Sequence, residues 1–320
     1  MSAPTVDAVA RAGGPHIPSL MARLEERLAV LATGHGAVLA EHAGATIAAG
    51  GKRLRPLLVF LAAGVQRGED VIRAAAAVEL IHSATLVHDD VLDGAALRRG
   101  RPTVVAEAGR AIATATGDLL FSRAFAELAA NGRAEQVRVL SEASSALAHG
   151  ELLQRADAWD ATVPVERYER RCELKTARLF EAACELGALT AAEDPAPLGR
   201  FGRRIGLAFQ LLDDVLDVSG PTERLGKQRG ADLLDGTVTL PLIFARQADP
   251  TLTAIDLRSI TTPELAEALC DRIERTDALE RARARALAIV AEAKAGLPAG
   301  PPAQRAALDL VADGVVERYS

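Results

Sequence analysis

One pentapeptide occurs twice in this chain of 320 residues. Residues 89–93 and 213–217 both read DDVLD, and each follows an apolar run with helical spacing. In a helix, the first and last aspartates of such a motif are i,i+4 neighbours, and the middle one is i,i+3 from the last. Three carboxylates near a helix C-terminus repel one another and are disfavoured by the helix dipole. A positive partner is therefore required.

Divalent cations are the natural partner. Mg²⁺ prefers oxygen ligands, keeps several waters, and commonly uses one or two carboxylates together with substrate phosphates. Two such motifs facing one another are expected to hold Mg²⁺ around a diphosphate. The alternative, two solvated acidic helix ends, is disfavoured because the same motif recurs on two apolar helices. The candidate metal ligands are Asp89, Asp90, Asp93, Asp213, Asp214 and Asp217.

Basic residues alternate with the acidic motifs. The turn Gly51-Lys52-Arg53-Leu54-Arg55-Pro56 places cations before an expected helix, and cations with helix N-terminal amides can bind anions. Taken singly, each basic group is better explained by a solvated face. The alternation instead predicts two phosphate sites, one metal-mediated and one bound directly by Arg and Lys. The other basic groups are Arg98, Arg99, Arg101, Lys175, Arg178 and Lys227.

Composition favours an all-α fold. Aromatic residues make up only 3% of the chain, and its Ala, Leu, Arg and Glu enter helices at little cost. We expect a flexible tail over 1–17 and one all-α domain over 18–320, a helical bundle with almost no strand. The segment 94–102 is expected to be a basic loop. Helices are expected over 18–49, 56–64, 70–92, 104–131, 134–156, 165–190, 196–218, 238–247, 263–295 and 302–318.

Charge and cysteine content exclude several classes. A net charge of -6 argues against a nucleic-acid binder, which normally carries a basic face. Cys172, Cys184 and Cys270 have no CxxC spacing, so buried thiols in a reducing cytosol are expected rather than disulfides or a zinc ribbon. No signal peptide and no transmembrane run is expected, which predicts a cytoplasmic protein.

Five segments together resemble a known family. GKRLRP, DDVLD with GAALRRGRPT, KTARLF, FQLLDDVLD and LGK are similar to the trans-prenyltransferases, the all-E polyprenyl diphosphate synthases. The resemblance covers about residues 20 to 318. It implies an all-α bundle around a central cavity, usually a homodimer. It also implies head-to-tail condensation of isopentenyl diphosphate with an allylic diphosphate (dimethylallyl, geranyl, farnesyl or geranylgeranyl).

The resemblance also implies residue roles. The six motif aspartates would hold about three Mg²⁺ ions on the allylic diphosphate, which Arg98 and Lys227 would also bind. Isopentenyl diphosphate would be bound by Lys52, Arg55, His82 and Arg99. The developing allylic cation would be flanked by Lys175, Thr176 and Gln210.

Helical spacing places His82, Thr85, Asp89 and Asp93 on one face, and His88 is left without a role. The released diphosphate is the expected base. One position departs from the family pattern: Thr237 stands where a lysine for the allylic diphosphate is usual. This departure predicts weaker allylic binding or altered substrate preference rather than loss of chemistry.

The resemblance also implies that product length depends on the side chains just before the first motif, where bulky residues close the product tunnel in this family. Ala84 and Thr85 are small, which predicts an open tunnel and a product of C30 or longer. Phe121 or Phe125 could instead close the tunnel, giving a geranylgeranyl or geranylfarnesyl product. The alternative for both phenylalanines is plain core packing. A terpene cyclase is disfavoured by the second DDVLD, and a non-catalytic partner subunit by retention of both motifs.

Overall fold

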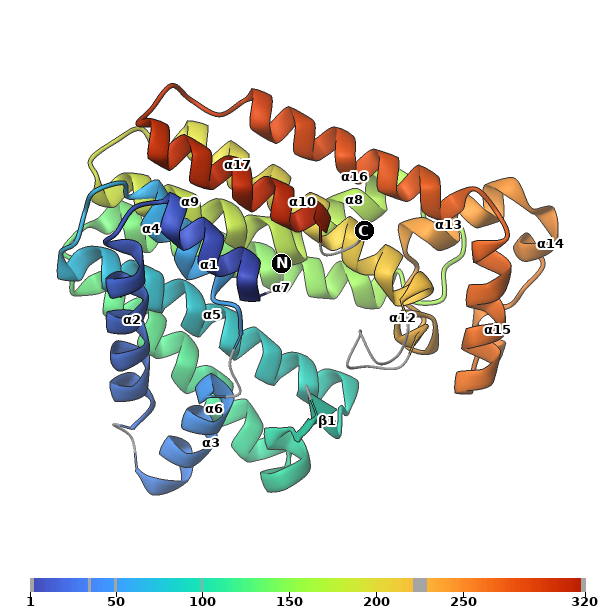
Figure 1. Ribbon diagram of the computed structural model, residues 1–320. Helices are drawn as coiled ribbons and strands as arrows, with labels where there is room; N and C mark the ends of the chain where they lie inside the picture. Colours follow the sequence, from blue (N-terminus) through green and yellow to red (C-terminus); the bar gives the residue numbers. More distant parts are fainter. Residues whose placement is uncertain (1–2, 34–35, 49–50, 99, 221–228, 318–320) are drawn as a thin grey trace. The chain divides into compact units, whose positions relative to one another are not determined.

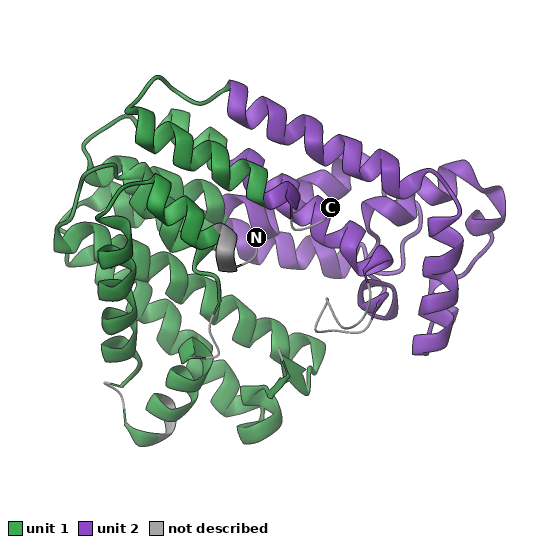
Figure 2. Ribbon diagram, in the orientation of Figure 1, with its two compact units in different colours: residues 1–144, 179–202, 296–314 green, residues 145–178, 203–295, 315–320 purple. Residues whose placement is uncertain are grey.

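The computed structural model describes residues 3–33, 36–48, 51–98, 100–220 and 229–317. Regular structure in these ranges is almost entirely helical, as predicted (Figure 1). The chain divides into two compact units (Figure 2). Unit 1 comprises residues 1–144, 179–202 and 296–314, and unit 2 comprises residues 145–178, 203–295 and 315–320.

Unit 1 is organised around one long helix. Helix α5 (Glu69–Asp93) packs against α2, α3, α4 and α6. Its middle is a run of small buried residues, 74–78, which lets neighbouring helices approach closely. The remaining helices that begin in this unit are α1 (Ala3–Ala12), α2 (Ile17–Ala32), α3 (Ala37–Ala48), α4 (Leu54–Ala62), α6 (Val104–Ala129), α7 (Ala134–Ala156), α10 (Pro195–Ser219) and α17 (Pro302–Glu317).

Helix α5 also has the composition of a membrane span. It contains an 18-residue window of mean hydropathy 1.2, although no such run was expected. Of that window, 72% is buried inside the protein. This degree of burial is typical of a core helix.

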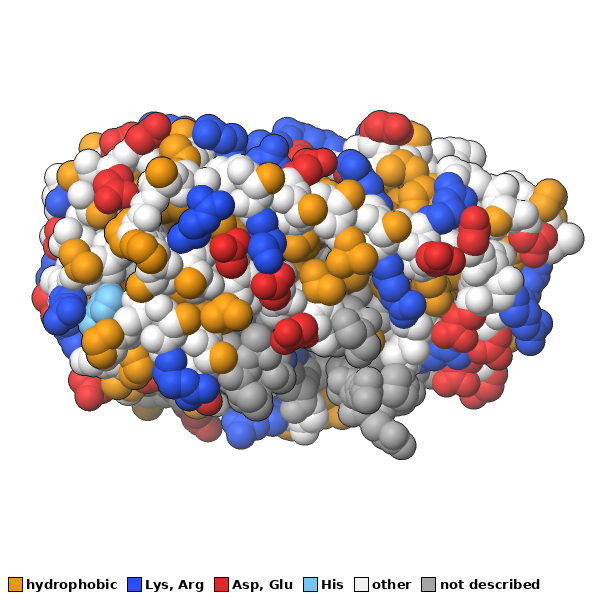
Figure 3. Space-filling view, turned by 45° about the horizontal axis from the view of Figure 1, so that its top comes forward, with side chains coloured by type: hydrophobic (Ala, Val, Ile, Leu, Met, Phe, Trp, Pro, Cys, Tyr) orange, Lys and Arg blue, Asp and Glu red, His pale blue; other side chains and the backbone are white. Residues whose placement is uncertain are grey.

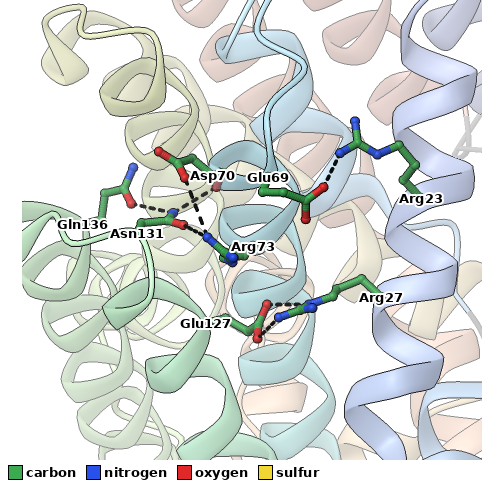
Figure 4. Close-up of polar contacts among 8 residues, drawn as sticks. All are labelled: Arg23, Arg27, Glu69, Asp70, Arg73, Glu127, Asn131 and Gln136. Carbon is green, nitrogen blue, oxygen red and sulfur yellow. Dashed lines mark hydrogen bonds and ion pairs between the residues drawn. The ribbon is translucent and has the colours of Figure 1, made fainter.

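Paired polar side chains join the helices of unit 1 (Figure 4). Arg27 of α2 donates from Nε and Nη2 to the two carboxylate oxygens of Glu127 on α6, at 2.9 and 2.7 Å. Arg23 pairs with Glu69 at the start of α5. Asn131 donates to the backbone oxygen of Asp70 and to Gln136. These bonds satisfy polar groups of α2, α5, α6 and the first turn of α7.

Unit 2 is organised around helix α13 (Leu240–Ala248), which packs against α8, α14, α15 and α16. Pro241 lies in its first turn, where a missing N–H costs nothing. Thr262 caps α15 by accepting a hydrogen bond from the Leu265 amide. The remaining elements are α8 (Val165–Cys172), a π-helical segment (Glu173–Ala177), α9 (Arg178–Thr190, mostly in unit 1), α12 (Ala231–Leu234), α14 (Pro250–Thr253), a 3₁₀ turn (Leu257–Ser259), α15 (Pro263–Glu274) and α16 (Ala278–Ala295).

The structure differs from several sequence predictions. The expected tail contains α1, which packs on α2 and buries Val9. The helix expected over 18–49 is two helices, α2 and α3. The helix expected over 263–295 breaks before α16, where the Thr276 hydroxyl accepts from the Ala278 amide and so competes with helical pairing. The helix expected over 165–190 contains the π-helical segment.

The segment expected to be a basic loop forms a small hairpin. Strand β1 (Leu97–Arg98) pairs antiparallel with β2 (Arg101–Pro102). Gly94, with φ of 62°, ends α5 in the left-handed conformation that favours glycine. The hairpin therefore turns the chain back toward the end of α5.

Surface charge and cysteine burial agree with the composition. Basic and acidic side chains are interspersed on the face shown in Figure 3. All three cysteines are buried as free thiols. Burial raises the pKa of Cys172 to about 12, which keeps that thiol protonated and unreactive at neutral pH.

Candidate active site

The first DDVLD motif forms the last turn of α5 in unit 1. Asp90 is 5% exposed, whereas Asp89 is half-buried and Asp93 is exposed. The hairpin brings Arg98 to Asp90, and its Nε and Nη2 both lie within 2.8 Å of Oδ1. Burial raises the pKa of Asp90, and the charge of Arg98 opposes that rise. Arg98 therefore helps to keep this buried carboxyl ionised.

Upstream on α5, partly exposed positions recur at helical spacing. His82, Thr85 and Asp89 are half-buried, whereas Ser83 and Ala84 are buried. The Thr85 hydroxyl donates to the backbone oxygen of His82 at 2.8 Å. These two side chains thus lie on the same stripe of the helix as the first motif aspartate.

The two arginines of the basic segment at the start of α4 have different surroundings. Arg53 is buried, with φ of 48°, and is fully occupied by protein acceptors. It binds Glu25 at 2.7 Å, Glu79 at 2.6 Å and the backbone oxygen of Ile47 at 2.9 Å. Arg53 is therefore a structural residue, and the expected cluster of three anion-binding cations is reduced to Lys52 and Arg55.

Arg55 is placed differently. Its guanidinium carbon lies 4.5 Å from the centre of the Phe180 ring, and its buried Nε has no hydrogen-bond partner. Burial lowers the pKa of Arg55 to about 10, against the opposing charge of Glu79, so the group stays cationic at neutral pH. A buried cationic donor without an acceptor is costly. An anionic ligand would satisfy it. Lys52, in the same turn, is exposed.

His88 of α5, which directly precedes the first motif, contacts helix α6. This imidazole stacks on Phe121, with ring centres 5.7 Å apart, and its Nε2 lies 3.4 Å from Asp118. A side chain at Gly117 would collide with it, at 2.2 Å from Nε2. His88 has no role in the sequence analysis, and the structure shows that it connects the first motif to Phe121. Phe125 is half-buried on the same helix.

The second DDVLD motif lies in unit 2 near the end of α10. Asp214 is 4% exposed, and both of its carboxylate oxygens are hydrogen-bonded. Tyr168 donates to Oδ2 and Gln210 donates to Oδ1, each at 2.7 Å. The Thr176 hydroxyl donates to the other end of the Gln210 amide, also at 2.7 Å. Burial, with the charge of Asp232, raises the pKa of Asp214 to about 8.

Two predicted residues lie in the π-helical segment. Such segments are frequent at functional sites. The Lys175 ammonium is paired with Glu151 of α7. The positive charge of Lys175 helps to lower the pKa of Glu151. A methyl group on Gly150 would lie 2.5 Å from the Lys175 backbone nitrogen, so only glycine allows α7 so close. Thr176 is the next residue in the segment.

Three residues of unit 2 were missed from sequence. Tyr168 and Arg171 are buried on α8, and Asp232 donates its backbone N–H to Asp217 Oδ2 at 3.2 Å. Asp217 is buried, and Thr237 donates its backbone N–H to the Asp232 oxygen at 2.8 Å. The sequence hints at Tyr168 only through its position, an aromatic residue seven positions before Lys175. Arg99 and Lys227 lie outside the described residues.

The donor chemistry of both motifs fits Mg²⁺. Every candidate ligand offers carboxylate oxygen, the donor that Mg²⁺ prefers. Within the ranges described, no three His, Cys, Asp or Glu side chains form a group able to hold an ion by themselves.

An all-α fold that carries two DDVLD helix ends is typical of a trans-prenyltransferase. The family model described as polyprenyl synthetase matches residues 37–272. The chain belongs to the polyprenyl synthetase family.

Individual relatives agree with this assignment. Heptaprenyl diphosphate synthase component 2 of Geobacillus stearothermophilus is 42% identical over 272 residues, covering 82% of this chain and 84% of that one. Octaprenyl diphosphate synthase of Escherichia coli is 41% identical over 221 residues, covering 66% and 68%. The crystal structure of a polyprenyl synthase from Caulobacter crescentus, complexed with calcium and isoprenyl diphosphate, has a TM-score of 0.90 at 35% identity, covering 100% and 98%.

Proposed function

We propose that this chain is a Mg²⁺-dependent long-chain polyprenyl diphosphate synthase. It condenses an allylic diphosphate with isopentenyl diphosphate, head to tail and all-trans, to a product of C30 or longer. The observation that carries the proposal is the family match together with two DDVLD motifs, each of which has its second aspartate buried. The relatives named heptaprenyl and octaprenyl synthases support the long product.

The two substrates would use different residues. Asp89, Asp90, Asp93, Asp213, Asp214 and Asp217 would hold about three Mg²⁺ ions on the allylic diphosphate. Arg98 and Lys227 would add cations there. Isopentenyl diphosphate would bind to Lys52, Arg55, His82 and Arg99, where the unsatisfied Arg55 Nε offers a donor.

Ionisation of the allylic C–O bond would follow from charge neutralisation. Bound Mg²⁺ supplies Lewis-acid stabilisation of the leaving diphosphate. Thr176 and Gln210 would direct dipoles at the allylic cation, and Lys175, compensated by Glu151, would stay beside it. The double bond of isopentenyl diphosphate then attacks, and the released diphosphate accepts the proton.

Assembly and location are part of the same proposal. We infer a cytoplasmic homodimer. Relatives named component 2 of heptaprenyl diphosphate synthase favour one other reading, that this chain needs a second component for activity.

The test is incubation of the purified chain with labelled isopentenyl diphosphate and each of four primers, dimethylallyl, geranyl, farnesyl and geranylgeranyl diphosphate. Parallel reactions contain Mg²⁺ or EDTA, and products are dephosphorylated and sized. Mg²⁺-dependent products of C30 or longer are expected. A stop at C20 or C25 would overturn the long-chain assignment, and no incorporation with any primer would overturn activity of the chain alone.

A further inference from the structure

Four side chains of unit 2 form a hydrogen-bonded network. Thr176 donates to Gln210 Oε1, Gln210 Nε2 donates to Asp214 Oδ1, and the Tyr168 hydroxyl donates to Asp214 Oδ2, each at 2.7 Å. Tyr168 is completely buried and Asp214 is 4% exposed. Tyr168 and Thr176 lie at opposite ends of this network.

The hydrogen bonds of this network have fixed donors and acceptors. The Gln210 amide presents its NH₂ group to Asp214, whose Oδ1 accepts the hydrogen bond. Its carbonyl oxygen then faces Thr176, which must donate. The orientation of Gln210 and of the Thr176 hydroxyl therefore depends on where the Asp214 carboxylate is held. With donors on both oxygens, that carboxylate is restricted to one orientation.

Tyr168 itself is held firmly. The guanidinium carbon of buried Arg171 lies 5.3 Å from the centre of its ring. Arg171 is fixed in turn by donating from Nη2 to the backbone oxygen of Val238 at 2.6 Å. Both residues lie on α8, one turn apart. The hydroxyl of Tyr168 is thus presented to Asp214 from a rigid position.

We propose that Tyr168 is a positioning residue for the allylic half of the reaction. Its hydroxyl holds Asp214, and through Asp214 it sets the Gln210 amide and the Thr176 hydroxyl. This inference rests on the proposed function, which places Thr176 and Gln210 beside the developing allylic cation. Tyr168 contacts neither substrate in this scheme.

The variant Tyr168→Phe tests the proposal, because it keeps the ring and its contact with Arg171 and removes only the hydroxyl. We expect kcat to fall about tenfold, with an unchanged KM for isopentenyl diphosphate. The matched control is Thr190→Val in unit 1. It also removes a buried hydroxyl, one that donates to the Gly187 backbone oxygen at 2.6 Å. Its kcat should not change.

A double-mutant cycle separates positioning from simple destabilisation. Hydrogen bonds through Asp214 and Gln210 connect Tyr168 to Thr176, so Tyr168→Phe and Thr176→Val should be non-additive in kcat. Mg²⁺-dependent binding of farnesyl thiolodiphosphate, measured by calorimetry, gives a second cycle that needs no turnover. Additive effects in both cycles, or wild-type kcat in Tyr168→Phe, would overturn the proposal. A wild type that binds the analogue without turnover would refute the proposed function, and the binding cycle would then decide the role of Tyr168.

Discussion

Arg55 lies over the ring of Phe180, with its guanidinium carbon 4.5 Å from the ring centre and its Nε without a hydrogen-bond partner. Arg55 is half-buried, but its Nε is buried, and a buried donor without an acceptor lowers stability and is one that an anionic ligand would satisfy. The neighbouring Arg53 has the opposite arrangement, since Glu25 and Glu79 both accept from it.

These two arginines should respond oppositely to the same change. We expect Arg55→Met to raise the melting temperature while raising KM for isopentenyl diphosphate at least tenfold, because it removes both the buried charge and the anion donor. Arg53→Met should lower the melting temperature, since it leaves Glu79 buried without its cation. Calorimetry and steady-state kinetics check both variants. A destabilised Arg55→Met with normal KM would contradict the assignment.

Arg98 is expected to matter through Asp90. Because Arg98 offsets the burial of that carboxyl, Arg98→Gln should raise the Mg²⁺ concentration for half-maximal activity and the allylic KM, each about tenfold. Arg101→Gln is the matched control, since Arg101 is exposed and pairs with Arg98 through the hairpin backbone. Mg²⁺ titrations of both variants decide the point. Equal behaviour would reduce Arg98 to a general surface charge.

Thr237 tests the departure from the family pattern. Its backbone N–H donates to the Asp232 oxygen, and Asp232 contacts Asp217. A cation introduced here would enter a region rich in carboxylates. We expect Thr237→Lys to lower the allylic KM several-fold, and exposed Thr162→Lys, in the same unit, to leave it unchanged. No change in KM or kcat for Thr237→Lys would refute the hypothesis.

Some of this site could be predicted from sequence and some could not. The paired DDVLD motifs and the spacing of His82, Thr85 and Asp89 follow from helical periodicity, which is local. The difference between Arg53 and Arg55 depends on Glu25 and Glu79, which come from other helices. Periodicity gives no sign of such tertiary partners. The same holds for Tyr168, whose hydroxyl meets a carboxylate 46 residues away.

The helix boundaries show the same limit. Helix α7 begins at residue 134 and ends at residue 156, as the sequence predicts. The π-helical segment with Lys175 and Thr176 was missed, since one extra residue in a turn leaves no mark on composition. Its place against Gly150 is tertiary information. Functional distortions of helices are therefore the features that sequence patterns hide most completely.

Stability of unit 1 should depend on the pairing between Arg27 and Glu127 (Figure 4). Arg27 is about one-third exposed, so solvent weakens the pair, but Glu127 is buried. We expect Arg27→Ala to lower the free energy of unfolding by about 1–2 kcal/mol. Arg138→Ala, which breaks an exposed pair with Glu142, should have little effect. Urea denaturation measures both, and equal losses would contradict the burial argument.

Product length should depend on side chains of α5 or α6, and their burial decides which substitutions can test this. Ala84→Phe should shorten the product if the tunnel runs along α5, but Ala84 is fully buried, and overpacking costs about 1–3 kcal/mol. Thr85 is half-buried, so Thr85→Phe adds the same bulk with less strain. Phe121→Ala, which removes the ring stacked on His88, should lengthen the product if that ring closes the tunnel. Exposed Thr114→Phe on α6 is the control. Sized products that stay the same in folded Ala84→Phe and Thr85→Phe would remove α5 from the tunnel wall. A change in Phe121→Ala alone would assign the floor to α6.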